Sequence, residues 1–206
     1  MSQSLEAFRN ALKIPELKRR MFFSLVMLAI YRLGCHVPTP GVNGSALAEA
    51  ISGMGGGLLG FYDMFSGGAF SNATVFSLGI MPYISASIIM SLLAAVIPAL
   101  EKLQKEGAEG QKKITEYTRY GTIVLCIVQS IGIAMFLQNI ESSGATIVPN
   151  PGWWFILMCI ISFTTGTAFI MWLGEQISEF GIGNGISLII FVSIVSRMPQ
   201  AFFNMI

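Results

Sequence analysis

Long apolar runs separated by short polar stretches make up most of this chain. A helix needs about 20 mostly apolar residues to cross the hydrocarbon core of a bilayer. Five runs approach that length, and the stretches between them are connectors, not domains. We therefore predict an all-α, polytopic membrane protein with five transmembrane helices. The predicted spans cover residues 21–37, 76–100, 120–138, 153–173 and 184–204.

The polar stretch before the first span has helical periodicity. Leu5, Phe8, Leu12 and Leu17 recur roughly one or two turns apart. This spacing predicts an amphipathic helix over residues 1–20 that lies on the membrane surface. A solvated leader is the alternative. We do not predict a cleaved signal sequence, because no small-residue cleavage site follows a short apolar core.

An interrupted apolar segment directly precedes the second predicted span. Residues 57–73 are apolar and aromatic but are broken by Asp63, Gly67, Gly68 and Asn72. The segment is too short to cross the bilayer, and a glycine inside a helix costs about 1 kcal/mol relative to alanine. Non-helical backbone at membrane depth is tolerated only inside protein or beside water. We predict a re-entrant half-helix in a protein-lined cavity near the outer side, with an interfacial loop as the alternative.

The composition supports the membrane class. The chain is 53% hydrophobic and only 11% charged, whereas a soluble domain is usually about one-quarter charged. The net charge of +1 gives no indication of nucleic-acid binding. The three cysteines have no regular spacing, and His36 is the single histidine. We therefore expect no disulfide framework, no metal site and no cofactor.

Basic residues are concentrated in two of the polar stretches. Residues 1–20 and 101–119 each contain five Lys or Arg, whereas residues 38–60 and 139–152 contain none. Short flanks rich in Lys and Arg stay in the cytoplasm. We therefore predict a cytoplasmic N-terminus and a cytoplasmic loop over residues 101–119. The connector 174–183 weakens this pattern, because it has two Glu and no Lys or Arg.

Polar side chains inside the predicted spans need partners, because lipid offers none. Gln129 must face protein or water, and Gly166 lies among small residues that favour close helix packing. Arg32 lies near the outer end of the first span. Its side chain either reaches outward to water or pairs with an acid such as Asp63 or Glu49.

Two pairs of isoleucines stand at helical spacing. Ile80 and Ile84 are four residues apart in the second span, and Ile186 and Ile190 are four apart in the fifth. Each pair shares one helix face, and the spacing by itself indicates core packing or lipid contact. The glycine-rich start of the fifth span is not a dinucleotide motif, because no strand precedes it. We expect Asn184 to cap the helix there.

Four separate stretches of the chain resemble the bacterial SecY family. They are RLGCHVPTPG, MFSGGAFSNATVFSLGIMPYISASIIMSLL, EGQKKITEYTRYGT and MWLGEQISEFGIGNGISLIIF. The resemblance runs nearly end to end but covers only the N-terminal half of that family's chain. It implies half of a ten-helix clam-shell channel with an hourglass pore in the cell inner (cytoplasmic) membrane. Such a channel moves unfolded secretory proteins across the membrane and passes membrane segments laterally into lipid.

The resemblance also implies roles for particular residues. The broken segment, about residues 60–72, corresponds to a short plug helix that closes the pore from outside. A ring of branched apolar side chains would seal around a passing chain and block ions by dewetting. Helices two and three would form one side of a lateral gate, and the loop 101–119 would contact cytoplasmic partners. The implied residues are Phe61, Asp63, Phe65, Gly67 and Gly68 for the plug; Ile80, Ile84, Ile186 and Ile190 for the pore ring; Ser87, Ile88 and Gln129 for the lateral gate; and Lys105, Lys112, Lys113 and Arg119 for the partner contact.

The partners that the resemblance implies are those of a translocation channel. They are the SecE and SecG subunits, the SecA motor, the ribosome, an unfolded secretory polypeptide with its signal sequence, the lipid bilayer and the remaining C-terminal half of the channel. Two departures from the family are visible. Helices six to ten, with the rest of the pore ring and gate, lie outside this chain, and Phe180 stands where the family often has a basic residue.

Three classes of function compete on these features. A passive protein-conducting channel needs no catalytic residue. A secondary transporter would bind a small solute at broken helices, but the middle of the spans holds Gln, Ser and Thr and no acid. An intramembrane protease needs a base within reach of a serine, and His36 lies near the end of a span. We expect a channel and not an enzyme, with the transporter as the alternative.

Overall fold

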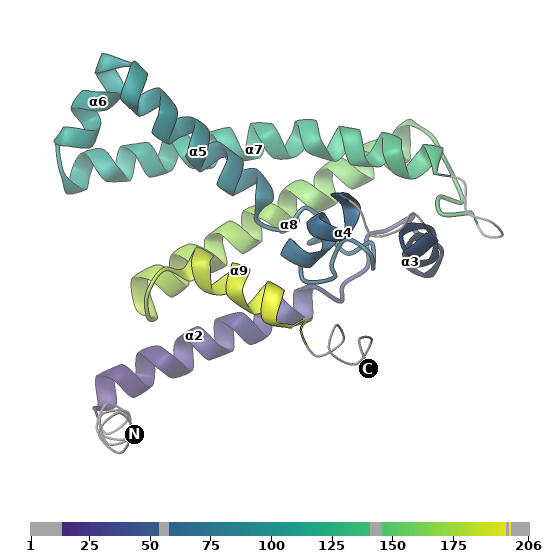
Figure 1. Ribbon diagram of the computed structural model, residues 1–206, viewed down its shortest axis with the longest axis horizontal. Helices are drawn as coiled ribbons and strands as arrows, with labels where there is room; N and C mark the ends of the chain where they lie inside the picture. The colour runs from purple at the N-terminus through teal and green to yellow at the C-terminus, as the bar shows by residue number, and fades with distance from the viewer. Residues whose placement is uncertain (1–13, 54–57, 141–145, 197, 199–206) are drawn as a thin grey trace.

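The structure is a computed structural model that describes residues 14–53, 58–140, 146–196 and 198. The side chains of residues 52, 53, 58, 59 and 61 lie outside this description as well. Apart from an isolated antiparallel bridge between Pro38 and Thr74, the regular structure of the described residues is helical (Figure 1). The all-α class predicted from the sequence is therefore confirmed.

The described helices follow one another along the chain. They are α2 (Pro15–Gly34), α3 (Gly44–Gly53), α4 (Leu58–Phe65), α5 (Met81–Val96), α6 (Pro98–Lys105), α7 (Ala108–Asn139), α8 (Trp153–Phe180) and α9 (Gly185–Val195).

Two of the described helices are long and apolar enough to cross a membrane by themselves. They are α7 and α8, with 32 and 28 residues. The pair α5 and α6 is a third candidate, bent by 101° at its break. Pro98 explains the break, because a proline disfavours helical backbone in the residue before it, and Ile97 is extended (φ −94°, ψ 114°). The predicted span 76–100 is therefore too long at both ends, since α5 covers only Met81–Val96.

α2 is continuous across the boundary that the sequence suggested between a surface helix and the first span. It begins at Pro15 and ends at Gly34. Residues 15–20 are therefore the first turns of the same helix, and not part of a separate amphipathic one. The rest of the predicted surface helix, residues 1–13, lies outside the described residues.

The last two spans also differ in length from the prediction. α8 starts at Trp153 as expected for the span 153–173, but it continues to Phe180. α9 covers Gly185–Val195, and most of the remainder of the predicted span 184–204 lies outside the described residues. The connector between these helices is therefore much shorter than the sequence suggested.

The predicted cytoplasmic loop 101–119 is a helical hairpin. α6 ends at Lys105 and α7 begins at Ala108. Gly107 makes the turn between them with φ +76°, in the left-handed region that favours glycine. The second half of the expected loop thus forms the first turns of α7, and its location in the cytoplasm stays a prediction.

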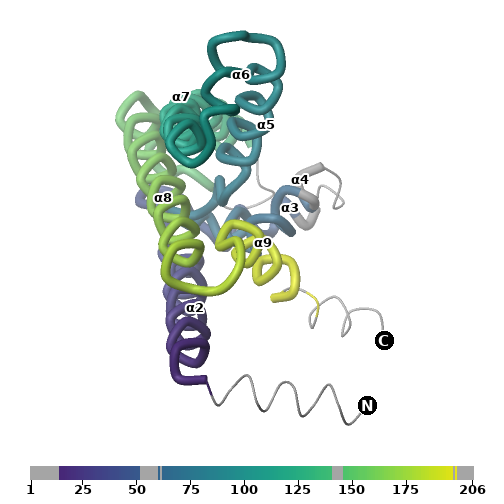
Figure 2. The backbone as a smooth tube through the Cα atoms, turned by 90° about the vertical axis from the view of Figure 1, so that its left-hand side faces the viewer, coloured from purple at the N-terminus to yellow at the C-terminus, as the bar shows by residue number. Residues whose placement is uncertain are grey.

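The helices place the described part of the first basic stretch, residues 15–20, at the same end of the molecule as the second basic stretch. In Figure 1 the start of α2, the α6–α7 hairpin and the α8–α9 turn lie on the left, while α3 and the connection from α7 to α8 lie on the right. Figure 2 shows the same arrangement turned by 90°, with α8 against α2 and α7 against α5. The described basic residues of both stretches are therefore near one end of the molecule. Which side of the membrane this end faces stays a prediction.

Two hydrophobic clusters hold the helices together. One joins α3 to α7 and α8 around Leu47 and Phe163. The other joins α2, the start of α5, α8 and α9 around Tyr31, Ile170 and Ile189. We call the second one the central cluster, and it contains the candidate site.

Gly166 lets the chain after α4 lie directly against α8. A Cβ atom placed on Gly166 would lie 2.2 Å from the Val75 carbonyl oxygen. The next residue, Thr167, donates from its hydroxyl to the Gly79 carbonyl at 3.4 Å. The close packing predicted for Gly166 is therefore present, but its partner is irregular backbone and not another helix.

Candidate functional site

The structure brings the four predicted pore-ring isoleucines together. Ile80 directly precedes α5, Ile84 lies in its first turn, and Ile186 and Ile190 lie on α9. All four belong to the central cluster, although the two pairs are far apart in the sequence. Their role as a pore ring stays a prediction, but both pairs contact the same cluster.

The isoleucines differ in exposure. Ile80 is 4% exposed, whereas Ile84, Ile186 and Ile190 are partly buried and pack against the cluster. Ile189 is 1% exposed, and the spacing argument missed it. Because α9 is apolar on every side, its sequence pattern does not distinguish the buried positions from the accessible ones. The three half-buried isoleucines form the accessible edge of the cluster, and the other two form its packed base.

The broken segment contains a short helix that ends at the predicted glycines. α4 covers Leu58–Phe65 and closes with a Schellman motif. The Gly67 N–H donates to the Met64 carbonyl at 3.2 Å, and the Gly68 N–H donates to the Asp63 carbonyl at 3.0 Å. Gly67 has φ +66°, which side-chain-bearing residues rarely adopt. The glycines thus terminate the half-helix, as the sequence predicted.

Hydrogen bonds hold the chain after α4 in a compact turn. Asp63 is 3% exposed, and its Oδ1 accepts a 2.8 Å hydrogen bond from the Ser71 N–H. The Ser66 hydroxyl donates to the Asp63 carbonyl at 3.0 Å. Asp63 therefore orders the turn that follows the helix. Of the other predicted plug residues, Phe65 is half-buried, and the Phe61 side chain lies outside the described residues.

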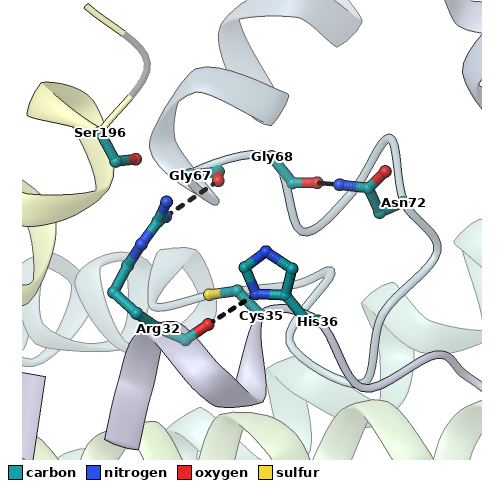
Figure 3. Close-up of a pocket in the computed structure, with 7 residues that line it drawn as sticks. All are labelled: Arg32, Cys35, His36, Gly67, Gly68, Asn72 and Ser196. Atoms are coloured by element: carbon teal, nitrogen blue, oxygen red, sulfur yellow. Dashed lines mark hydrogen bonds between the residues drawn. The ribbon is translucent and has the colours of Figure 1, made fainter. Parts of the chain in front are cut away.

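Arg32 reaches the end of this short helix. Its Nη1 donates to the Gly67 carbonyl at 3.3 Å, and its own carbonyl oxygen lies 2.9 Å from His36 Nδ1 (Figure 3). The sequence left open an outward orientation or an acidic partner, and the contact found here is with backbone. A polar cavity of about 200 Å³ adjoins it. Its walls are Arg32, Cys35, His36, Gly67, Gly68, Asn72 and Ser196.

The predicted lateral-gate residues lie on α5 and α7, which pack against each other. Ile88 is 55% exposed. Ser87 is half-buried, and its carbonyl accepts a hydrogen bond from the Ser91 hydroxyl at 2.8 Å. Gln129 is half-buried too, and its enclosed Oε1 has no hydrogen-bond partner among the described residues. The three residues have different surroundings, so their shared role stays a prediction.

The predicted partner-contact lysines lie on the α6–α7 hairpin. Lys112 and Lys113 are exposed in the first turns of α7. Lys105 is the last residue of α6, and its Nζ lies 2.5 Å from Glu101 Oε1 one turn earlier. These side chains sit on a regular helical surface, so a partner would meet a fixed spacing of charges.

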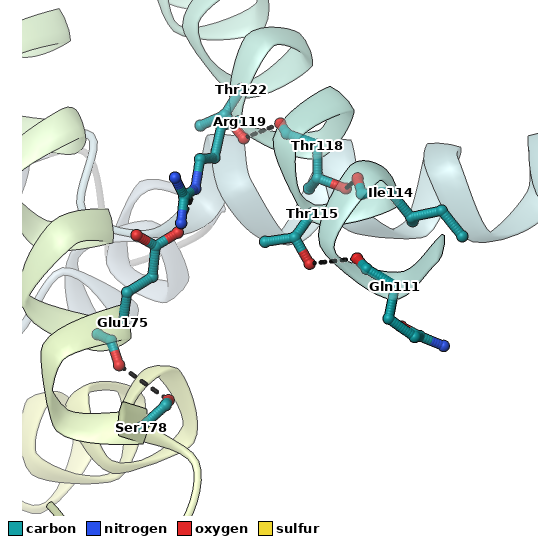
Figure 4. A network of polar contacts seen from close by, with 9 residues as sticks. Gln111, Ile114, Thr115, Thr118, Arg119, Thr122, Glu175 and Ser178 are labelled. Carbon is teal, nitrogen blue, oxygen red and sulfur yellow. Dashed lines mark hydrogen bonds and ion pairs between the residues drawn. The ribbon is translucent and has the colours of Figure 1, made fainter. Parts of the chain in front are cut away.

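Arg119 is tied to a neighbouring helix. Its Nε lies 2.5 Å from Oε1 of Glu175 on α8 (Figure 4), and the two side chains are 44% and 23% exposed. Sequence reasoning missed this ion pair. One feature of the sequence indicated it: Glu175 is one of two acids in a connector that has no basic residue of its own, so a basic partner had to come from elsewhere. The pair joins α7 to α8 toward the end of the molecule that carries the α6–α7 hairpin.

The chemistry of this site is packing and hydrogen bonding. Within the described ranges, no three His, Cys, Asp or Glu side chains gather closely enough to hold a metal ion. Cys35, Cys126 and Cys159 are buried free thiols. What the fold assembles is an apolar cluster with a hydrogen-bonded turn beside it, which suits the exclusion of water.

Sequence comparisons find a family and close relatives. A family model described as SecY matches residues 74–206. Protein translocase subunit SecY of Buchnera aphidicola subsp. Acyrthosiphon kondoi is 52% identical over 188 residues, which cover 91% of this chain and 52% of that protein. The Escherichia coli K12 subunit is 50% identical, with coverages of 91% and 42%. The Aquifex aeolicus subunit is 46% identical, with coverages of 98% and 47%. The chain thus spans about half the length of the curated relatives it matches.

Solved structures share the fold. A protein-conducting channel matches with a TM-score of 0.62 at 20% identity, covering 88% of this chain and 37% of its own. Sec61 in a canine ribosome–channel complex gives the same TM-score and coverages. A structure reported for the plug domain of the SecY protein matches with a TM-score of 0.61 and covers 91% of this chain. The helical arrangement described above is therefore that of a SecY or Sec61 channel.

Proposed function

The chain belongs to the SecY family, and we propose that it forms the N-terminal half of a protein-conducting channel in the cell inner membrane. The channel passes unfolded secretory proteins across the membrane and releases membrane segments laterally into the lipid. The N-terminus faces the cytoplasm, together with the α6–α7 hairpin. Because the relatives are about twice as long as this chain, the remaining C-terminal half of the channel completes the pore.

The cluster that the isoleucines share carries this proposal. Ile84, Ile186 and Ile190 form the accessible edge of the central cluster, and Ala69, in the turn after α4, packs into the same cluster. Branched apolar side chains make a constriction that water leaves and ions cannot cross. In this proposal the isoleucines are half of the pore ring, and residues 60–72 are the plug that closes the pore from outside.

A small-solute transporter is not favoured. The relatives are named protein translocase subunits, and the structural neighbours are protein-conducting channels. The one buried acid of the broken segment, Asp63, binds a backbone N–H and orders a turn. We assign no catalytic residue to this chain, and the driving energy comes from SecA, the ribosome or the membrane potential.

The partner surfaces follow from the exposed groups. We assign Lys105, Lys112 and Lys113 to contacts with SecA or the ribosome, because they line one helical hairpin at the proposed cytoplasmic end. Ser87, Ile88 and Gln129 remain the candidates for the lateral gate, where a signal sequence would enter the lipid. SecE and SecG complete the complex in this proposal.

Crosslinking tests the pore assignment. A single cysteine replaces Ile84 in an otherwise cysteine-free channel that includes its C-terminal half, and a secretory chain with a photo-probe is stalled in transit. The matched control is a cysteine at Ile89, which is 45% exposed and lies about 140° round α5 from Ile84. We expect crosslinks to position 84 and not to position 89. Equal crosslinking at the two positions, or crosslinking only at 89, would reject the pore ring.

A further inference from the structure

Arg32 has no role in the function proposed above, but its contacts indicate one. A charged side chain at a membrane span is costly without a partner, and Arg32 is half-buried. Its Nη1 donates to the carbonyl of Gly67, the left-handed residue that terminates α4 (Figure 3). The guanidinium therefore binds the C-terminal end of the short helix. A cation is favoured there, because the helix dipole places partial negative charge at that end.

The turn after α4 lies in a site between α2 and α9, which we call its seat. Tyr31, the residue before Arg32 on α2, fixes the α9 side of this seat. The Tyr31 hydroxyl lies 2.7 Å from the Ser193 hydroxyl of α9. Gly67 fits between α9 and Arg32, because a Cβ atom placed on it would lie 3.2 Å from the Ser193 Cα and 3.3 Å from Arg32 Nη1. Two consecutive residues of α2 thus hold α9 and the turn after α4 in one place.

We infer that Arg32 is a latch that holds the turn after α4 in its seat against α2 and α9. The inference rests on the proposed function in so far as that turn belongs to a plug. The latch is a polar contact beside a polar cavity of about 200 Å³. Water in that cavity can replace the Gly67 carbonyl as the partner of the guanidinium, and such an exchange has a small net free energy. The latch therefore favours the closed position without making it permanent.

The helix α9 carries both a wall of the seat and two of the pore-ring candidates. Ile186 and Ile190 lie on α9 in the turns before Ser193. In this proposal a polypeptide that enters between the isoleucines pushes α9 outward and moves Ser193 away from Gly67. One wall of the seat is then gone, and the Arg32 contact becomes a larger share of what holds the turn until it is released.

The native Cys35 thiol reports the release. Cys35 is 3% exposed and lines the cavity together with Gly67 and Gly68, so displacement of the turn uncovers it. The assembled channel, with its C-terminal half and partner subunits and with every cysteine except Cys35 replaced by alanine, is treated from outside with a membrane-impermeant maleimide. The alkylation rate then measures the fraction of time that the turn is displaced.

Substitution of Arg32 should raise that rate. Arg32→Met removes the donor and keeps an unbranched apolar stem, and we expect alkylation about tenfold faster, as for the loss of a hydrogen bond to a charged group. Arg32→Lys keeps a cationic donor and should restore a rate near that of the unchanged channel. Arg20→Met is the matched control, because Arg20 lies at the other end of α2, 3.8 Å from Glu16, and should leave the rate unchanged.

Several outcomes overturn the latch. It fails if Arg32→Met alkylates no faster than Arg20→Met. It also fails if Arg32→Lys is as fast as Arg32→Met, because packing and not the donor would then be responsible. If Arg32→Met does not assemble, Arg32→Gln takes its place, since its shorter amide does not reach the carbonyl and the same rise is expected.

Ion leak through reconstituted vesicles separates the latch from the plug. Deletion of residues 60–72 should raise the leak if the segment is a plug, and Arg32→Met should raise it too but add nothing in the deleted channel. A leak after deletion without faster alkylation of Arg32→Met rejects the latch and keeps the plug. Faster alkylation without a leak in either variant keeps the latch and rejects the plug.

Discussion

The Tyr31 and Ser193 hydroxyls lie 2.7 Å apart in the buried contact between α2 and α9. Ser193 donates its own proton to the Ile189 carbonyl at 2.8 Å, so Tyr31 is the donor of the shared hydrogen bond. Both residues are 1% exposed. The bond holds α9, which carries two of the pore-ring candidates, in a fixed position against the first long helix.

Removal of the Tyr31 hydroxyl should therefore weaken the fold. Tyr31→Phe removes one buried hydrogen bond and keeps the ring, so we expect the free energy of unfolding to fall by about 1 kcal/mol. The measurement is the thermal unfolding midpoint of the assembled channel in detergent. Tyr120→Phe is the control, because Tyr120 is 68% exposed. Equal midpoints for the two variants would contradict a stabilising role for the α2–α9 bond.

A methyl group at Gly166 should be much less tolerated than one at Gly132. The added Cβ at Gly166 meets the Val75 carbonyl at 2.2 Å, whereas a Cβ at Gly132 meets nothing within 4 Å. We expect Gly166→Ala to destabilise by about 1–3 kcal/mol through overpacking. Gly132→Ala, inside the last third of α7, should be neutral or slightly stabilising. The ranking is checked by yield of folded channel and by its unfolding midpoint, and a Gly166→Ala channel as stable as Gly132→Ala would show that α8 and the Val75 backbone separate freely.

The Arg119–Glu175 ion pair should couple α7 to α8 only modestly. With side chains 44% and 23% exposed, solvent screens the pair, and we expect a coupling of about 0.5–1 kcal/mol. A double-mutant cycle with Arg119→Gln and Glu175→Gln measures it. The coupling should shrink as the salt concentration rises, because exposed charges are screened. A coupling unaffected by salt would mean that the pair is more enclosed than the structure shows.

Loss of the Asn184 cap at the start of α9 should lower the stability, and a substitution that keeps a capping oxygen should not. Asn184 Oδ1 accepts a hydrogen bond from the Ser187 N–H at 3.1 Å, as the sequence predicted for this position. Asn184→Ala should cost about 1 kcal/mol, whereas Asn184→Asp should retain most of the stability. Unfolding midpoints of the two variants decide the matter, and an Asp variant as unstable as the Ala variant would remove the cap as the explanation.

Local chemistry made much of the fold predictable. The apolar runs gave the helices because a bilayer requires a long apolar stretch and helix formation satisfies every backbone group within it. Gly67 ended α4 because a left-handed residue closes a helix, and Asn184 capped α9 because a side-chain oxygen satisfies its first N–H groups. Each of these effects acts within a few residues, so the sequence contains the information.

Helix boundaries were less predictable, again for a physical reason. Hydropathy did not show that Pro98 bends the second span by 101°, or that α2 begins at Pro15 and not at residue 21. The hydropathy pattern also indicated a loop over residues 101–119, because charged residues are unfavourable in lipid. A charged helix that extends beyond the membrane satisfies the same constraint.

The sequence by itself determined that this is an all-α membrane protein of the SecY family, with a broken segment before the second span and isoleucine pairs at helical spacing. The tertiary structure decided which groups meet. It placed both isoleucine pairs in one cluster, Arg32 on the Gly67 carbonyl and Arg119 on Glu175. Spacing along one helix fixes only which side chains share a face. A contact between helices depends on how all of them pack, and no short stretch of sequence contains that information.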